Sequence, residues 1–504
     1  MKNAGSFIGL VAISILVALV PLTGCGRSDQ GAQSDNAAAK APRPLPAGAR
    51  GPVTPEQELA KRMNLLGRFT VHNKPDDRAT VTSTANADAI EWKTATLLDG
   101  SRRSGLTNEA ALLEASNVFR LYAEFSSGRQ QGRTNLTSAL ASISAAGAAD
   151  PFVRFLLVDF HGVKTNTVVQ TAIALADTTA RLQESAHHPL FRFAAAHRTS
   201  FFARRADLHG NRAFVLSLAT QNLEDLAKDK NAPWLEIYEA IHRWMDYNST
   251  KGWEEWVMAD LGGILATNWT EKAGRHELLG RTEIDLAWKE RGDGFVNTVS
   301  ETAFRKFDEH LKKAEQHLDR AWKLDTNSTR TARAMMRVEL GQGRGVQRER
   351  MWFDRVMALD TNHYQACKAM SYYLEPRWHG SEDQALRFAR TCVTSTKWGV
   401  DVPLVLKDLH KSLAAYYRLE DPDKYWHRPQ VWNDVRMSYE KFFKLNPDAV
   451  EYRHDYASDA YLCGKYQVFI DELPKFTAGT NFSFFGGVTN FVSMVSKARE
   501  RAGK

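Results

Sequence analysis

The sequence predicts an all-α protein, and three stretches with apolar residues at helical spacing carry that prediction. Residues 150–160 begin with aspartate and proline, a common N-cap and first-turn pair, and continue with phenylalanines and leucine on one helix face. Residues 107–125 and 231–244 follow the same pattern. Residues 69–93 differ, because their valines and threonines favour short strands.

The chain begins with an apolar run that predicts an export signal over residues 1–24. The run from Phe7 to Val20 is shorter than the ~20 residues that span a bilayer, and it fits the core of a signal peptide. It leads to the sequence LTGC, ending at Cys25, which resembles the lipobox of bacterial lipoproteins. The resemblance implies that cleavage leaves Cys25 as a lipidated N-terminus that anchors the chain to a membrane. The alternative is a plain signal peptide followed by a chance cysteine.

Residues 25–57 predict a disordered tether between that anchor and the folded body. The stretch has few large apolar residues and is rich in Ala, Gly, Ser, Gln and Pro, so it cannot bury enough surface to fold. Gly26 follows the cysteine, where lipoproteins retained in the inner membrane of some Gram-negative bacteria carry aspartate. The lipoprotein resemblance therefore implies the bacterial cell envelope, with the periplasmic side of the outer membrane preferred.

The length and the charge of the residues after the tether are those of an ordinary folded protein. Of 504 residues, 66 are lysine or arginine and 59 are aspartate or glutamate, which gives a formal net charge of +7. Both signs are interspersed without a basic run, so we expect no nucleic-acid partner. We divide the body into an N-terminal helical domain at 58–300, a repeat domain at 301–480 and a C-terminal capping segment at 481–504.

Cysteine is sparse for an exported protein. With Cys25 acylated, Cys367, Cys392 and Cys463 remain, an odd number without CxxC spacing. Either two of them form a disulfide or all three are small buried side chains, and we expect burial.

The C-terminal third repeats a short pattern at the ends of its expected helices. Each copy places leucine, then aspartate or asparagine, then a helix breaker: AWKLDTN at 321–327, VMALDTN at 356–362 and FFKLNPD at 442–448. Thr326 and Thr361 lie 35 residues apart, close to the tetratricopeptide period of about 34. The pattern predicts helical hairpins in series, and an irregular helical bundle with chance spacing is the alternative.

The last of these units matches the repeat pattern best. After Pro447, we expect Tyr456 and Ala457 on a first helix, Gly464 at the turn and Phe469 on a second helix. The small alanine lets the two helices pack closely, and the glycine permits positive φ. The unit resembles a tetratricopeptide repeat, which implies a right-handed superhelix of degenerate α-α hairpins and a role in protein–protein interaction.

The stretch from about Ala287 to Cys392 carries a second resemblance. Its segments are, in order, LAWKERGDGFVNTV, LKKAEQHLDRAWKLDTNS, VELGQGRG, MALDTNHYQACKAMSYYLEPRWHGS and ALRFARTC. Together they resemble a bacterial domain family of unknown function that occurs in exported, repeat-containing proteins. The resemblance implies helical repeats and assigns no reaction.

Within that stretch, LEPRWHGS at 374–381 interrupts an expected helical hairpin. Its proline stops the first helix and its final serine can cap the second, so the residues between them exceed what a turn needs. Surplus loop residues often bind ligands. Arg377, Trp378, His379 and Gly380 are therefore candidates for a binding loop, or for a structural elbow in which Trp378 covers the end of the helix pair.

We expect no catalytic site, metal or cofactor. The sequence has no HExxH, GxSxG or phosphate-binding loop. The histidines are scattered, and even His187, His188, His197 and His209 lack the tight spacing of a zinc site. The adjacent glutamates of WEEW, at 253–256, cannot converge on one substrate from a helix. A glycosidase pair drawn from distant carboxylates stays open, because sequence spacing does not fix it.

Tryptophan is concentrated between Trp234 and Trp432, which bound twelve of the thirteen. Most of these rings should be core, and a few exposed ones would anchor a partner. Three functions remain open: a membrane-anchored scaffold for protein or peptide partners, which we prefer, a module that binds cell-wall or other polysaccharide, and a hydrolase of envelope glycans. A row of exposed tryptophans would favour polysaccharide, a groove with Asn and Arg would favour peptide, and two carboxylates across a cleft would favour hydrolysis.

Overall fold

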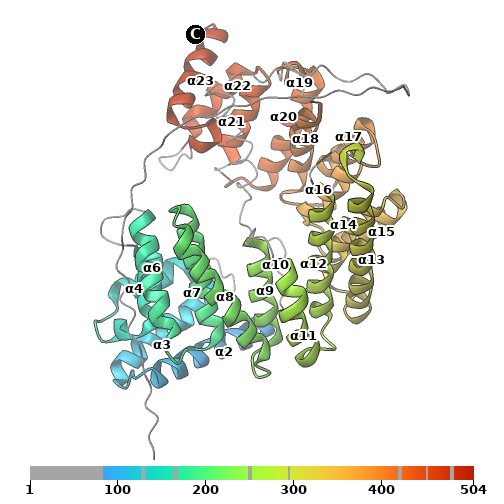
Figure 1. The fold of residues 1–504 in the computed structure, drawn as a ribbon. Helices are drawn as coiled ribbons and strands as arrows, with labels where there is room; N and C mark the ends of the chain where they lie inside the picture. Colours follow the sequence, from blue (N-terminus) through green and yellow to red (C-terminus); the bar gives the residue numbers. More distant parts are fainter. Residues whose placement is uncertain are drawn as a thin grey trace, which may run out of the picture. The chain divides into compact units, whose positions relative to one another are not determined.

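The described part of the chain consists of helices and their connections (Figure 1). The computed structural model describes residues 83–126, 132–162, 168–247, 253–292, 294, 296–417, 423–449, 452–476 and 482–503, and no strand occurs among them. The prediction of an all-α protein is therefore confirmed for these residues. The predicted signal peptide, tether and lipidated Cys25 lie outside the described residues.

The N-terminal helices pack against one another largely in chain order. They are α2 (Ser83–Arg103), α3 (Glu109–Ser126), α4 (Gly132–Ser142), α5 (Pro151–His161), α6 (Val168–Gln183), α7 (Pro189–Arg205), α8 (His209–Lys228), α9 (Trp234–Tyr247), α10 (Trp253–Trp256) and α11 (Gly262–Asn268). A 3-10 turn, η1 (Gly147–Ala149), precedes α5, and a π-helical turn, η2 (Val257–Leu261), joins α10 to α11. Contacts link α2 with α3, α5 with α6, and α7 with both α6 and α8.

The C-terminal helices form a series of pairs. They are α12 (Ala273–Arg291), α13 (Glu301–Leu324), α14 (Thr329–Gln342), α15 (Val346–Leu359), α16 (Tyr364–Tyr373), α17 (Glu382–Thr394), α18 (Val405–Tyr417), α19 (Asp423–Trp426), α20 (Pro429–Leu445), α21 (Tyr452–Leu462), α22 (Tyr466–Glu472) and α23 (Val488–Arg501). Short 3-10 turns are η3 (Val296–Thr298), η4 (Val402–Leu404), η5 (Leu473–Lys475) and η6 (Phe482–Phe485). Within the pairs α12–α13, α14–α15 and α16–α17 the helices pack together, and α12, α14, α16 and α18 also contact each other in that order.

Helix α5 starts where its sequence predicts. The side chain of Asp150 accepts hydrogen bonds from the backbone amides of Phe152 and Val153, at 2.8 and 2.9 Å. Pro151 occupies the first turn, where its missing amide costs nothing. The helix ends before Gly162, whose φ of +67° suits glycine.

The three repeated helix ends are also confirmed. Helices α13, α15 and α20 end at Leu324, Leu359 and Leu445, the leucines of the repeated pattern. After the first two, the following aspartate accepts a hydrogen bond from the amide two residues further on, at 2.9 Å in both cases. This local bond competes with continued helix and explains why the pattern terminates it.

The expected strands near 69–93 are wrong for residues 83–93, which form the first half of α2; residues 69–82 lie outside the described part. Ile90, Leu97 and Ser101 of α2 are all buried, at spacings of seven and four residues. These spacings place them on one helix face. Burial of that face outweighs the weak strand preference of Thr84 in this stretch.

The apolar core divides within α12. One cluster of buried side chains runs from Leu97 to Leu278, and a second runs from Ile284 to Cys463. A small third cluster joins Phe469 of α22 to Phe485 and to Ala498 of α23. The cysteines at 367, 392 and 463 are free and buried, which confirms the expectation of burial.

Candidate functional site

The LEPRWHGS loop joins α16 to α17 and follows the local geometry that its sequence requires. The hydroxyl of Ser381 accepts a hydrogen bond from the amide of Gln384 at 3.2 Å and caps α17. Gly380 lies against the backbone of Leu374, where an added Cβ would stand 2.3 Å from the carbonyl oxygen. Only glycine fits such a close approach, so the loop returns tightly onto the end of α16.

Trp378 packs against the C-terminal end of α12 and so holds the loop there. Its ring meets that of Trp288 edge-on, with centroids 5.6 Å apart. The guanidinium of Arg291 lies 5.6 Å from the Trp378 ring and 5.5 Å from the Trp288 ring. These aromatic and cation–π contacts join two segments that lie about ninety residues apart in the chain.

His379 connects the loop to the C-terminal end of α14 through a hydrogen bond and a packing contact. Its Nε2 is 2.8 Å from the carbonyl oxygen of Leu340, so this nitrogen donates the hydrogen bond. The ring centroid lies 4.7 Å from that of Tyr373, with the two rings tilted by 39°, and the imidazole lies against Gly343, where a Cβ would come within 2.8 Å of it. The VELGQGRG and LEPRWHGS segments therefore contact each other directly.

Arg377 points to α18. It donates a hydrogen bond to the carbonyl oxygen of Ser412 at 2.6 Å, and its guanidinium lies 5.0 Å from the ring of Tyr416. Its Nε is 2.7 Å from a carboxylate oxygen of Glu375. Burial raises the pKa of Glu375 above its ordinary value. The loop's side chains are thus directed at α12, α14 and α18, as in a structural elbow.

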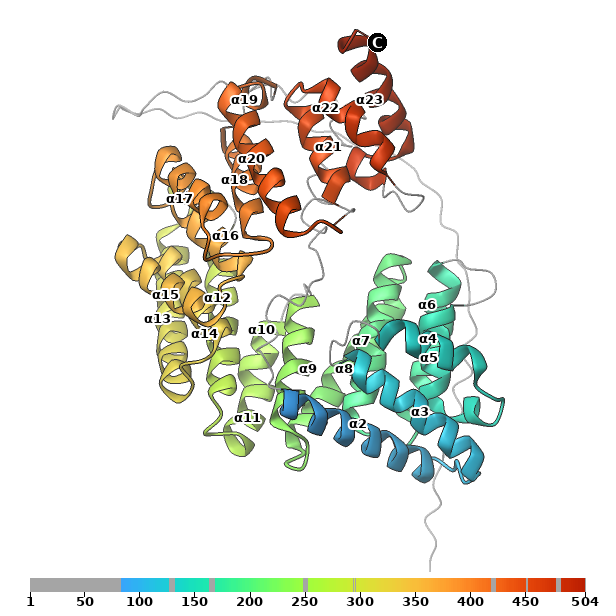
Figure 2. The ribbon, with the colours of Figure 1, turned by 180° about the vertical axis from the view of Figure 1, so that it is seen from behind.

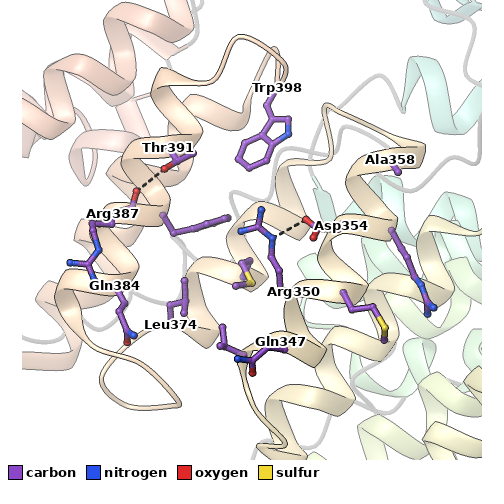
Figure 3. Close-up of a pocket in the computed structure, with 14 residues that line it drawn as sticks. Gln347, Arg350, Asp354, Ala358, Leu374, Gln384, Arg387, Thr391 and Trp398 are labelled. Carbon is purple, nitrogen blue, oxygen red and sulfur yellow. Dashed lines mark hydrogen bonds and ion pairs between the residues drawn. The ribbon is translucent and has the colours of Figure 1, made fainter.

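A groove of about 970 Å³ lies between α15 and α17, and Figure 3 shows its lining. Met370 of α16, Leu374 directly after that helix and Phe388 of α17 line it and are buried, so its floor is apolar. Trp398 stands at one end (Figure 3). An apolar floor open to solvent is the usual anchor for a bulky side chain of a partner.

The rim of the groove is positively charged. Three arginines and one aspartate are its charged lining residues. Arg350 pairs with Asp354 of the same helix at 2.8 Å, as drawn in Figure 3. Arg387 pairs with an aspartate one turn earlier in α17, and Arg355 packs over the ring of Trp352 at 4.2 Å. The excess of guanidinium groups favours carboxylates on a ligand.

Sequence reasoning missed this groove. The groove forms because two helical hairpins pack side by side, and the spacing of residues within one helix does not show how two hairpins pack. One signal was present: Val346 and Met351 are large apolar residues of α15 that stay 38% exposed, outside the stripe that the helix buries.

A buried trio has the composition of a hydrolytic triad but a different pattern of hydrogen bonds; it consists of Ser101, Asp150 and His187. The Ser101 hydroxyl donates to Asp150 Oδ2 at 2.6 Å, and His187 Nε2 lies 3.0 Å from the same oxygen. A triad requires the base to contact the nucleophile, whereas here both contact the carboxylate. Burial alone would raise the pKa of Asp150, but the bonds from His187 and Ser101 outweigh it and lower this pKa. The trio caps α5 and holds α2 against it.

A second buried pair ties α9 to α12. His242 Nε2 lies 2.9 Å from Glu277 Oε2, and the Tyr238 hydroxyl donates to the same oxygen at 2.9 Å. Arg281 contacts the other imidazole nitrogen. Burial alone would raise the pKa of Glu277, but His242 and Arg281 lower it to about 2. His242 and Glu277 are 4% and 1% exposed, so the pair holds α9 and α12 together inside the protein and does not face a ligand in solvent.

His188 and the two glutamates of WEEW have structural partners. His188 caps α7 by accepting from the amide of Leu190 at 3.2 Å, and its other ring nitrogen lies 2.8 Å from Asp229. Both glutamates of WEEW form ion pairs with the Nζ of Lys289: the distance to a carboxylate oxygen is 3.3 Å for Glu254 and 3.0 Å for Glu255. Among the residues that the structure describes, no group of three His, Cys, Asp or Glu side chains is arranged to hold a metal ion.

The tryptophans between 234 and 432 pack within the body. Five of the twelve are buried: Trp244, Trp253, Trp269, Trp352 and Trp426. The other seven are half-buried, so none of the twelve is exposed. The row of exposed rings that would favour polysaccharide does not occur among them.

The chain matches no protein-family model and none of the curated proteins. The resemblances of LTGC and of the stretch 287–392 therefore stay predictions. No helix in the described part of the chain is both long enough and apolar enough to cross a membrane.

Proposed function

We propose that the chain is a lipid-anchored scaffold of the bacterial cell envelope that holds a segment of another protein in the groove between α15 and α17. The anchor is Cys25, and the preferred location is the periplasmic side of the outer membrane. The groove, with its apolar floor and its arginine rim, carries the part of the proposal that concerns a partner.

We further propose that the C-terminal pairs form a right-handed superhelix similar to tetratricopeptide arrays. The successive contacts among α12, α14, α16 and α18 support this arrangement, because the first helices of stacked hairpins meet in this way. The turn between α21 and α22 adds support, since Gly464 has a φ of +68°. In such an array, a groove between two hairpins suits an elongated partner.

The dimensions of the groove set the length of the bound segment. Gln347 and Ala358 line it eleven residues apart on α15, a span of about 17 Å at ~1.5 Å per residue. An extended peptide covers this span with about five residues at ~3.3 Å each. We propose that the segment places one large apolar side chain over Met370 and Phe388, and carboxylates beside Arg350 and Arg387.

The alternative functions have less support. Polysaccharide binding lacks its row of exposed tryptophans between 234 and 432. Hydrolysis of a glycan needs two carboxylates facing the scissile bond, and Asp354 is the single acidic residue among those that line the groove.

Site-specific photo-crosslinking tests the proposal in the cells that make the protein. The full chain carries p-benzoylphenylalanine in place of Thr391, which lines the groove, or in place of Leu113, a control residue on α3 that is 75% exposed. We expect from position 391 a crosslinked product of higher mass than the chain, whose added mass a muramidase leaves in place, and no such product from position 113. Ala358→Trp should fill the groove and abolish the product while the circular dichroism spectrum stays unchanged.

Other outcomes would overturn the proposal. A product whose added mass a muramidase removes would assign the groove to polysaccharide. Equal crosslinking from positions 391 and 113, or a product that survives Ala358→Trp, would show that the groove is not the binding site.

A further inference from the structure

A second surface, independent of the groove, lies at the N-terminal ends of α6 and α8. Four large apolar side chains are exposed there: Val168, Val169 and Ile173 of α6 are 41%, 43% and 52% exposed, and Phe214 of α8 is 56% exposed. Residues of this size are normally buried, and several together mark an interaction surface.

The register of the helices brings these side chains together. Figures 1 and 2 show α6, α7 and α8 side by side, and the short connections between them make α6 and α8 run in the same direction. The amide of Asn222 on α8 donates to the side-chain oxygen of Gln183 on α6 at 2.7 Å. Counting back ten residues on both helices places Ile173 level with Arg212. Phe214 then lies within one turn of Ile173.

Arginines lie beside this apolar surface. Residues 204–214, which end α7 and begin α8, contain three arginines, no lysine and one acidic residue. Arg204 and Arg205 end α7 on the same side, and both are exposed. Arg212 lies close enough to Arg204 that burial and this neighbouring charge lower its pKa.

Two acidic groups nearby pair with arginines other than those that end α7 and begin α8. Asp177 pairs with Arg181 of its own helix at 3.0 Å, and Asp159 pairs with Arg198 at 2.7 Å. Asp207 stands in the connection between α7 and α8. The apolar side chains thus sit beside an excess of positive charge.

We propose that this surface rests on a leaflet of anionic phospholipid. Exposed apolar side chains partition into the interface of a bilayer, and neighbouring guanidinium groups bind the phosphates of anionic lipids. A flat anionic surface satisfies both features at once. The anchor proposed at Cys25 precedes the first described residue, Ser83, by 58 residues, so it would keep the chain near a membrane.

Environment-sensitive fluorescence tests this contact at single positions. In the full chain with Cys25→Ser, a nitrobenzoxadiazole group is attached at Ile173→Cys or Phe214→Cys, and at Leu113→Cys on α3 as the control. The three other native cysteines are buried and do not compete for the label. All labelled residues are exposed, and circular dichroism verifies that each variant folds. The control also accounts for any membrane binding by the apolar N-terminus.

We expect the emission from positions 173 and 214 to shift to shorter wavelength with vesicles of phosphatidylglycerol and phosphatidylethanolamine, and not with phosphatidylcholine alone. Arg204→Glu with Arg205→Glu should abolish the shift. Unchanged emission at both positions, an equal shift at position 113, or an equal shift on phosphatidylcholine would overturn the proposal. A shift caused by membrane-free cell extract, without one on the anionic vesicles, would assign the surface to a protein instead.

Discussion

Trp378 and His379 are neighbours in the chain, yet their side chains contribute differently to stability. Trp378 is half-buried between Trp288, Arg291 and Tyr372. Trp378→Ala should lower the free energy of unfolding by about 1–3 kcal/mol, less than the loss of a fully buried ring. The imidazole of His379 is exposed and makes one hydrogen bond, so His379→Ala should cost about 0.5–1.5 kcal/mol.

Chemical denaturation of both variants checks this order. A larger loss of stability in His379→Ala than in Trp378→Ala would contradict the packing described for the loop. Loss of an enzymatic activity in a folded His379→Ala variant would contradict the scaffold function itself.

Glu349 of α15 should make stability depend on pH. Its carboxyl group is 1% exposed. Burial, with Glu339 as a second cause, raises its pKa from 4.5 to about 9. The folded protein then keeps a proton that the unfolded chain releases between these two values. The contribution of this group to stability is therefore full below pH 4.5 and is lost as the pH rises toward 9.

Glu349→Gln removes the titration while keeping the shape of the side chain. We expect this variant to be more stable than the natural protein at pH 8, on the order of 5 kcal/mol, and nearly unchanged at pH 5. The exposed Glu184→Gln serves as the control and should alter stability at neither pH. Parallel unfolding curves at both pH values test this, and an equal effect of Glu349→Gln at pH 5 and pH 8 would refute it.

At the scale of elements, the turn between α21 and α22 depends on Gly464. Its φ is +68°, and an added Cβ would stand 3.0 Å from Nε2 of His427. Gly464→Val should lower the free energy of unfolding by about 1–3 kcal/mol. Gly464→Asn meets the same neighbour but tolerates positive φ, so it should cost less. Equal thermal unfolding of the natural protein and Gly464→Val would count against this hairpin.

Helix ends were predictable from sequence, and helix contacts were not. The ends at Leu324 and Leu359 follow from local chemistry, because the aspartate after each leucine bonds to an amide two residues on. The failure at 83–93 arose because strand preference is a weak local signal, while the burial of Leu97 depends on α3 and the helices beyond it. The LEPRWHGS turn was identified in sequence, but its partners Trp288 and Leu340 are set by tertiary structure.

At the scale of the whole molecule, attachment to the membrane depends on Cys25. Cys25→Ser removes the residue that would carry the acyl chains, so cell fractionation should show less protein in the membrane fraction. A high-salt wash should release what remains, because the surface at α6 and α8 would bind lipid partly through charge. A salt-resistant membrane fraction equal to that of the natural protein would contradict lipidation of Cys25.

The function of the whole chain was less predictable than its helices. Composition and motifs gave no sign of several enzyme classes, but the groove exists because α15 and α17 lie beside each other over the floor of α16. Arg350 and Arg387 belong to ordinary solvent-facing i,i+4 pairs when each helix is considered alone. Their shared role at one rim appears only when the two hairpins are packed.

Selection of random peptides on the immobilised full chain tests most directly whether the groove binds a protein segment. The proposal predicts that the retained peptides carry aspartate or glutamate next to a large apolar residue within about five positions. With Arg350→Glu and Arg387→Glu, the selected peptides should exchange acidic for basic residues and keep the apolar one. Retained peptides with the same composition for both proteins, or none retained above background by the natural chain, would contradict the account.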